Sequence, residues 1–416
     1  MEIQFEPLSP QWRDDPYSVY RQLREHDPVH WAPEAKAYCI SRYDDVVRVM
    51  RDAETFSSGA MGTELMANDF GGMKLRNLPR ILRFLWRARV NPLTRERPQA
   101  LISIDPPRHE ELRSIVNRGF TPRRVEAWGA RVQQIVDDCL ADLDRRGSFD
   151  VVRDLAVPLP TQIIAEMLGV GLDRLDDFKR WTNAIVALAS GSAKADPTQT
   201  GALEELGELF GAMREIVRER SARPQDDLVS AIVDPAHGKS LSELEVINFV
   251  VLLLAAGNET TTNLIGNATN ALLAHPEELA KVNADPSRIP GMLEEVLRYD
   301  PPVQLLYRNT TCDVVLSGRE IPAGSIVVPI LASANRDESR FPKADCFDVE
   351  RDAKGHIAFG FGVHFCLGAS LARLEAKLAM RSLVPHLPGL RRASPHDLWL
   401  DSSMVRGRTS LELVAA

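Results

Sequence analysis

Apolar side chains recur every three to four residues along most of the chain, the spacing that gathers them on one face of an α-helix. Five segments show this spacing and are predicted to be helical: residues 15–26, 44–52, 126–145, 204–220 and 241–275. Short strand-like runs lie between and after them, at residues 29–31, 37–40, 314–316 and 325–329. The first two runs flank Pro33 and Glu34 and are expected to form a hairpin. The pattern predicts a mainly α fold with a small β region.

The composition describes an ordinary globular protein with ample core, because 44% of the residues are hydrophobic and 26% are charged. No internal repeat, low-complexity linker or change of composition marks a boundary, so one domain is expected over residues 1–416. The net charge of −8 argues against general binding to nucleic acid.

The ends and the cysteines bear on location. Residues 1–7 are acidic and lack the basic and apolar regions of a signal peptide. The longest strongly apolar run, Phe249 to Ala256, is too short to cross a bilayer, so no transmembrane segment is expected. The five cysteines have neither zinc-site nor disulfide spacing, which favours a reducing, cytoplasmic location.

One cysteine stands between a glycine-rich approach and a predicted helix from Leu367 to about Leu383. Gly360 and Gly362 can take backbone angles closed to other residues and let a flat ligand come close. Cys366 stands at the helix start, where the thiol pKa falls and the thiolate is favoured. A thiolate can ligate iron through one sulfur, and a Cys-ligated haem promotes O–O cleavage. The plainer interpretation, a buried and inert cysteine, is the usual one for an isolated cysteine.

A second string with candidate chemistry runs from Ile104 to Arg113. Pro107 suits the first turn of a helix, with Asp105 just ahead of it as a candidate cap. His109 and Arg113 are four residues apart, so they share one face of that helix. Such a pair is also common on ordinary helix surfaces.

The predicted helix over residues 241–275 contains Ala-Ala-Gly-Asn-Glu-Thr-Thr-Thr at positions 255–262. Glycine and threonine are poor helix-interior residues, and a threonine hydroxyl can bond to a carbonyl one turn away. Further on, Glu295 and Arg298 can pair as i and i+3 neighbours, and Arg351 follows in Phe-Asp-Val-Glu-Arg at 347–351. Ordinary helices also contain such strings.

Taken in order, these motifs resemble those of the cytochromes P450. Residues 359–369, Phe-Gly-Phe-Gly-Val-His-Phe-Cys-Leu-Gly-Ala, match the family's haem-binding signature. Residues 255–261 resemble its oxygen-activation motif, and Glu295, Arg298 and Arg351 its structural Glu–Arg–Arg cluster. The resemblance implies the single-domain P450 fold, with haem b between the 241–275 helix and the helix that follows Cys366.

The resemblance also implies roles for single residues. Cys366 would be the axial ligand of the haem iron, and Glu259 and Thr260 would deliver protons for oxygen activation. The other cofactor-binding residues that it implies are His109, Arg113, Arg308 and His364 at the propionates, Gly257 in the oxygen groove, and Phe359, Gly360, Leu367 and Gly368 around the sulfur. The substrate-pocket candidates by family position are Ala255, Ala256, Val303, Leu305, Leu306 and Met404.

The implied activity is that of a monooxygenase that inserts one atom of O₂ into a substrate. Its electrons would start at NAD(P)H and arrive through an external ferredoxin reductase and ferredoxin. The pocket candidates are small or apolar, which implies a lipophilic small-molecule substrate. Arg108, Arg118, Arg373 and Lys377 are candidates for docking an acidic partner. Two alternatives on the same fold stay open: a peroxide-driven peroxygenase or non-redox isomerase, and a non-enzymatic haem sensor.

One stretch remains outside these motifs. Residues 71–95 carry seven basic side chains and no acidic one. Ile81, Leu82, Leu85 and Trp86 would share one side of a helix there. We expect residues 71–97 to be a basic insertion that forms a lid over the pocket or touches a membrane surface. A solvated surface helix with a buried stripe is the alternative.

Overall fold

The computed structural model describes residues 3–59, 83, 100–141, 143, 147–189, 201–234 and 241–416. The chain divides into two compact units, each assembled from segments that are far apart in the sequence. The first consists of Met1–Ala60, Val125–Pro160 and Thr260–Ala416, and the second of Met61–Arg124 and Thr161–Glu259.

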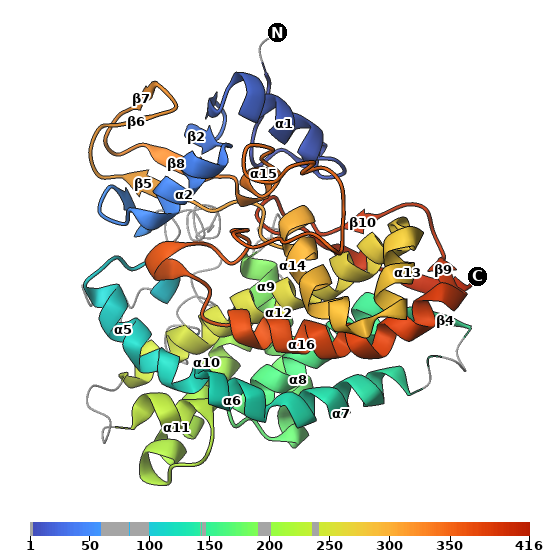
Figure 1. Cartoon of the computed structure of the whole chain (residues 1–416). Coiled ribbons are helices and arrows are strands. Elements are labelled where there is room, and N and C mark those ends of the chain that lie inside the picture. Colours follow the sequence, from blue (N-terminus) through green and yellow to red (C-terminus); the bar gives the residue numbers. More distant parts are fainter. Residues whose placement is uncertain are drawn as a thin grey trace. The chain divides into compact units, whose positions relative to one another are not determined.

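The first unit has a helical part built on α16. Its helices are α1 (Tyr17–His26), α2 (Tyr43–Arg51), α7 (Gly129–Leu140), α13 (Pro276–Ala284), α14 (Ile289–Tyr299), α15 (Leu331–Ala334) and α16 (Ala369–Leu383). Helix α16 packs along α7 and against α14 (Figure 1). It does so through an apolar stripe at helical spacing that includes Leu371, Ala376, Met380 and Leu383, all buried.

The first unit also contains a five-stranded sheet in the order β1-β2-β8-β5-β3. The strands are β1 (Val29–Ala32), β2 (Ala37–Ile40), β8 (Ile326–Pro329), β5 (Arg308–Thr310) and β3 (Phe56–Ser57). The β1–β2 hairpin pairs Val29 with Ile40, and β2 runs parallel to β8 with Ala37 opposite Ile326. Strand β5 pairs antiparallel with β8, which places Arg308 opposite Val327.

Three smaller sheets complete the β region. They are formed by β6 (Val314–Leu316) with β7 (Arg319–Ile321), by β4 (Ser148–Asp150), β12 (Glu412–Ala415) and β9 (Leu390–Arg392), and by β10 (Leu398–Trp399) with β11 (Arg408–Ser410). In the middle of the three-stranded sheet, Leu413 faces Phe149 on one side and Arg392 on the other. The three-stranded sheet thereby joins the chain's last residues to the segment Val125–Pro160 of the same unit.

A fully buried ion pair links α14 to the chain segment that precedes residues 359–369, which we call the cysteine loop. Arg298 and Glu295 are both inaccessible to solvent and bond through two parallel contacts of 2.7 Å. Arg298 also donates to the carbonyl oxygens of Asn335, Ala344 and Cys346, and Arg351 reaches Glu295 at 3.2 Å. These bonds leave no buried charge uncompensated, which is what makes such a pair tolerable in a core. The expected Glu–Arg–Arg cluster is confirmed.

The described residues of the second unit form helices, turns and loops but no β-strand. It contains α5 (Arg108–Val116), α9 (Leu175–Ala189), α10 (Ala202–Ala222) and α11 (Leu228–Val233). Helices α9 and α10 pack together, and Arg180 on α9 forms ion pairs with Glu205 and Glu208 on α10. Ion pairs from Arg108 to Glu245 and from Arg214 to Glu243 tie α5 and α10 to the start of α12.

Three helices have residues in both units, because the unit boundaries fall within them. They are α6 (Pro122–Ala127), α8 (Pro158–Met167) and α12 (Glu243–Ala274), which is divided after Glu259. With 32 residues, α12 spans about 48 Å at 1.5 Å per residue. Of the helices that the structure describes, α12 has the length and hydropathy to cross a membrane, which is weak evidence because a core helix passes the same test.

Most of the predicted elements are present within one to three residues of their expected bounds. The predicted helix over 126–145 is in fact two helices, α6 and α7, with Trp128 between them. The expected cap was wrong: Pro107 occupies the cap position of α5 without a side-chain hydrogen bond, and Asp105 contributes its carbonyl oxygen to the N–H of His109 at 3.0 Å. Strands β3, β4, β5, β7 and β9–β12 were not predicted. Residues 71–97 lie outside the described residues, except position 83.

Candidate active site

The cysteine loop is held in shape by its own backbone. The N–H of Cys366 donates to the carbonyl of Phe359 at 2.9 Å, and the N–H of Gly360 to that of Ile357, also at 2.9 Å. Gly360 and Gly362 both have φ of +73°, a conformation that other residues rarely adopt. At Gly362 a Cβ atom would come within 2.7 Å of the Met50 carbonyl oxygen on α2. Gly360 is therefore required for its backbone angle, and Gly362 is required both for its backbone angle and for its lack of a side chain.

Cys366 lies just before α16, which begins at Ala369 rather than at Leu367. A short 3₁₀ turn over Gly362–His364 precedes it, and Gly368 occupies the cap position. The sulfur-bearing side chain is partly exposed, and a Cβ atom added at Gly368 would meet no protein atom within 4 Å. Cys366 thus lies two residues before the cap of α16, close to a helix N-terminus, where negative charge is favoured.

The first unit also carries two nitrogen-bearing side chains that were expected at the propionates. His364 lies 2.9 Å from the Ser58 hydroxyl through its Nε2 atom. Arg308 is 2% exposed on β5, and its guanidinium donates to the Tyr307 carbonyl at 2.7 Å. Both side chains are thus held in place by neighbouring groups.

In the second unit, His109 and Arg113 share a face of α5, as predicted. His109 is 1% exposed; burial lowers its pKa, and the charge of Arg113 lowers the pKa further. A neutral imidazole at pH 7 is an N–H donor rather than a cation. Arg113 remains partly exposed and donates to the Asn117 side chain at 3.2 Å.

The string at 255–262 lies within α12. A Cβ atom at Gly257 would stand 3.2 Å from the Ile164 side chain of α8, so the two helices approach closely there. Asn258 accepts a hydrogen bond from Thr161 at 3.1 Å, and Thr262 donates to the Ala156 carbonyl at 2.8 Å. Asn258 and Thr262 therefore secure α12 to the preceding chain, and Thr262 does not bond back within its own helix.

Glu259 lies in the same string on α12, and burial raises the pKa of its carboxyl group to about 7. A carboxyl group with that pKa is close to half protonated at neutral pH, so it can both hold and release a proton. Thr260 follows it directly on α12.

The substrate-pocket candidates fall into two groups. Ala255 and Ala256 lie on α12 in the second unit. In the first unit the N–H of Gln304 donates to the Met404 carbonyl at 2.8 Å, and Val303 pairs with Val405, so the segments around 304 and 404 are neighbours. Leu305 is 1% exposed and packs against protein, whereas Val303, Leu306 and Met404 are partly exposed.

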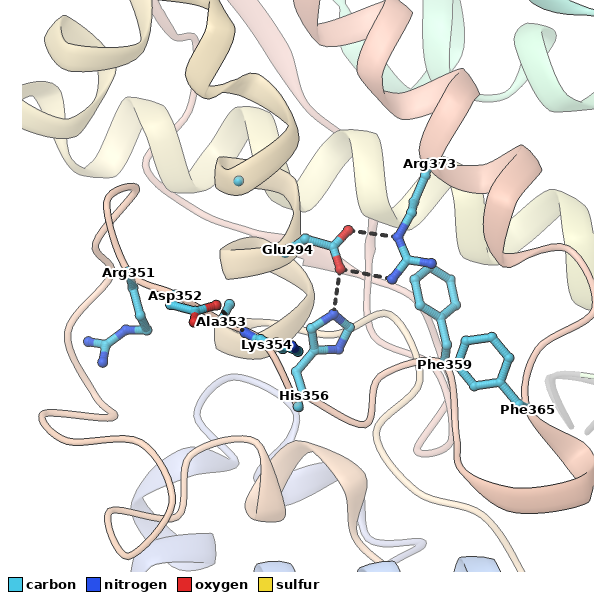
Figure 2. A pocket seen from close by; sticks show the side chains of 11 residues that line it. Glu294, Arg351, Asp352, Ala353, Lys354, His356, Phe359, Phe365 and Arg373 are labelled. Carbon is cyan, nitrogen blue, oxygen red and sulfur yellow. Dashed lines mark hydrogen bonds and ion pairs between the residues drawn. The ribbon is translucent and has the colours of Figure 1, made fainter. Parts of the chain in front are cut away.

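A polar cluster beside the cysteine loop was missed by sequence reasoning (Figure 2). Glu294 on α14 binds Arg373 on α16 through two contacts of 2.7 and 2.8 Å, and His356 through one of 2.9 Å. Arg373 had been expected to project as a docking cation. The three residues are 17 to 79 positions apart, so no sequence spacing pointed to the cluster.

Comparisons with known proteins identify the family. The cytochrome P450 family model matches residues 289–387. Cytochrome P450 107B1 of Saccharopolyspora erythraea is 39% identical over 404 residues, covering 95% of this chain and 94% of that protein. Vitamin D(3) 25-hydroxylase of Pseudonocardia autotrophica is 36% identical over 403 residues, covering 95% and 92%. The crystal structure of CYP109E1 from Bacillus megaterium with corticosterone superimposes with a TM-score of 0.82 at 33% identity, covering 97% and 99%.

The chain belongs to the cytochrome P450 family and has the P450 fold. Its members are haem monooxygenases, which bind haem b through a cysteine thiolate and typically draw electrons from NAD(P)H through redox partners. The residues described above fit that group. Cys366 offers a partly exposed sulfur just before α16, and the first unit adds Arg308 and His364 as partners for carboxylates.

Proposed function

We propose that the chain inserts one oxygen atom of O₂ into a lipophilic small molecule, with Cys366 as the axial ligand of its haem. The observation that carries this proposal is the cysteine loop. The hydrogen bond from the Cys366 N–H to the Phe359 carbonyl and the two glycines at φ +73° present one sulfur just before a helix start. The balanced reaction is R–H + O₂ + 2e⁻ + 2H⁺ → R–OH + H₂O.

The chain's own residues would hold the cofactor and supply protons. The haem, once bound through a thiolate, supplies O–O cleavage. Arg308, His364 and Arg113 would bind the propionates through charge-assisted hydrogen bonds, and neutral His109 would donate an N–H. Phe359, Gly360, Leu367 and Gly368 would surround the sulfur, and Gly257 would keep α12 open at the oxygen groove.

Glu259 and Thr260 would deliver the two protons. The pKa of Glu259 near 7 supports this role, since a general acid is most effective when its pKa lies near the working pH. The same residues argue against a peroxide-driven peroxygenase, which needs no proton delivery to split O₂. Comparing turnover with H₂O₂ and turnover with O₂ plus a reductase and ferredoxin separates the two.

The electrons would come from an external ferredoxin and its NAD(P)H-dependent reductase in the cytoplasm. The relatives support a lipophilic substrate: one is a vitamin D(3) hydroxylase, and a structural relative binds corticosterone. We therefore place a polycyclic lipophile such as a steroid first, ahead of macrolides, terpenoids and fatty acyl chains. Ala255, Ala256, Val303, Leu306 and Met404 would line its pocket, with Leu305 behind them.

The axial ligand is tested with Cys366→His, and Cys346→Ser serves as the control because Cys346 is exposed. The histidine variant should still bind some haem but lose the red-shifted carbon monoxide band of the reduced protein and lose hydroxylation. The control should keep both. A Cys366→His variant with an unchanged band and full hydroxylation would show that another residue ligates the iron.

The substrate class is tested by titrating the oxidised protein with a steroid, a macrolide and a long-chain fatty acid. The expected result is displacement of the iron-bound water by the steroid, seen as a shift of the haem absorption band. Tighter binding of the fatty acid would place the substrate among acyl chains instead.

A further inference from the structure

A cleft of about 330 Å³ opens beside the cysteine loop, wholly within the first unit. Phe359 and Phe365 form one part of its wall, and Glu294, His356 and Arg373 another (Figure 2). In Figure 2 the side chains of Glu294, His356 and Arg373 point toward one another, and Arg373 extends over the Phe359 ring. A partly exposed arginine side chain is ordinarily mobile, so the fixed position of Arg373 needs a cause.

Glu294 is the group that holds Arg373. Its two oxygens accept from Nε and a terminal nitrogen of Arg373, the bidentate geometry that fixes a guanidinium in one orientation. His356 completes the arrangement. The Ala358 N–H donates to its Nδ1 at 3.2 Å, which leaves the proton on Nε2 to be donated to Glu294 at 2.9 Å. Three chain segments thus fix one cation.

The fixed guanidinium acts on the cysteine loop in two ways. Its central carbon lies 4.4 Å from the centre of the Phe359 ring, a stacked cation–π contact. The carbonyl of Phe359 accepts the Cys366 N–H, so a fixed ring holds the backbone at the sulfur. The pKa of Arg373 is raised mainly by its hydrogen bonds to Glu294 and by the charge of Glu294; the charge of Cys366 raises it further, so Arg373 and Cys366 interact electrostatically.

We propose that Arg373, fixed by Glu294 and His356, is a positioning residue that holds Phe359 over the cysteine loop and sets the reduction potential of the iron. The proposal rests on the proposed function, because it takes Cys366 as the axial thiolate. A positive charge near a thiolate draws electron density away from the iron and favours the reduced state. Outer groups of this kind are recognised levers on the potential of a metal site.

The alternative is that Arg373 is a plain surface cation that only attracts an acidic partner. Such a cation would change the affinity for a ferredoxin and leave the isolated protein's potential unaltered. The decisive measurement is therefore made on the haem-loaded protein without any redox partner.

The variants are Arg373→Gln, Arg373→Lys and the matched control Lys377→Gln. Lys377 lies one turn further along α16, is exposed, and carries the same charge without belonging to the cluster. Potentiometric titration should show a lower potential in Arg373→Gln, by at least a tenfold change in the reduction equilibrium, about 59 mV for one electron. The decrease in potential is large because Arg373→Gln leaves the negative charge of Glu294 with His356 as its remaining partner in the cluster. Arg373→Lys should fall between wild type and Arg373→Gln, and Lys377→Gln should change the equilibrium less than twofold.

Equal potentials in Arg373→Gln and Lys377→Gln would overturn the proposal. Should Arg373→Gln fail to fold, Arg373→Lys carries the test, because a lysine cannot form the bidentate pair and a wild-type potential there also overturns the proposal. If the wild-type protein itself lacks the red-shifted carbon monoxide band, the assignment of Cys366 has failed instead. The two failures are thus distinguishable.

Discussion

At the scale of single residues, the chemistry depends on a few side chains whose surroundings change their ordinary behaviour. The pKa values of Glu259 and Glu294 are shifted in opposite directions. Burial raises the pKa of Glu259 to about 7. Burial would also raise the pKa of Glu294, but hydrogen bonds from Arg373 and His356 and the charge of Arg373 outweigh it and bring the pKa to about 2. One carboxyl group is thereby able to donate a proton at neutral pH, and the other is a permanent anion.

The proton-delivery role predicts a pH dependence. Thr260→Ala and Glu259→Gln should keep substrate affinity but divert NAD(P)H electrons into peroxide, with a loss of product of roughly 10²–10⁴-fold, the range of general-acid catalysis. In the parent, the ratio of product to NAD(P)H consumed should fall as the pH rises through about 7, because Glu259 loses its proton. Glu259→Gln should abolish that inflection. Unchanged coupling in both variants would contradict the role.

The ion pair of Glu294 predicts a pH-dependent contribution to stability. Its pKa is lower in the folded protein than the ordinary 4.5, so the stabilisation is present above about pH 4.5 and is lost as the pH falls through 2. Glu294→Gln should therefore cost on the order of 1–3 kcal/mol at pH 7, after allowance for solvent screening, and almost nothing near pH 2. Urea unfolding across pH measures this. Glu320→Gln, at an exposed position on β7, is the control and should show no such trend.

At the scale of elements, two contrasting ways of holding a loop meet at Cys366. Upstream, Arg298 and Glu295 fix the chain through buried charge-assisted bonds. Within the loop, glycines let the backbone come close to α2 where no side chain would fit. The loop conformation therefore depends on the absence of a side chain at Gly362 as much as on hydrogen bonds.

This dependence can be measured with Gly362→Ala and the control Gly318→Ala. Both glycines have positive φ, +73° and +82°, but a Cβ atom at Gly318 would meet nothing within 4 Å. The control should cost about 1 kcal/mol of unfolding free energy from backbone strain alone. Gly362→Ala should cost about 2–4 kcal/mol, because a clash is added, and should lower haem incorporation during expression. Equal costs would show that the approach to Met50 is not restrictive.

At the scale of the whole molecule, charge is distributed unevenly along the chain. The chain carries a net charge of −8, yet every charged side chain in residues 71–95 is basic. The expectation that residues 71–97 form an amphipathic lid stays a prediction, as does a single domain over residues 1–416.

The lid hypothesis is tested by neutralising Arg80, Arg83 and Arg87 together. Three converging arginines should raise encounter rates with an anionic substrate or a membrane surface, most strongly at low salt. The triple variant should thus weaken substrate binding or association with anionic liposomes at low ionic strength, and little at high ionic strength. Binding that is unchanged at every salt concentration would leave a solvated surface helix.

Much of this architecture could be read from local patterns. Helices such as α12 and α16 were predicted because their apolar residues repeat with the period of the helix, and the β1–β2 hairpin because its two runs are adjacent in sequence. Strands such as β5 and β12 were missed because neither lies beside its partner in the sequence: Arg308 pairs with Val327 and Leu413 with Phe149. Pairing over such distances leaves almost no local pattern.

The sequence by itself determined the family, the cysteine and the residue types around it, because the backbone needs of that loop restrict which residues can stand there. Only the tertiary structure decided which charges act together. Glu294, His356 and Arg373 come from a helix, a loop and another helix, and each alone would pass for a surface residue. The energy of an ion pair depends on distance and burial, and neither quantity is encoded locally in the chain. The pKa of Glu259 follows the same rule, since burial is a property of the folded molecule.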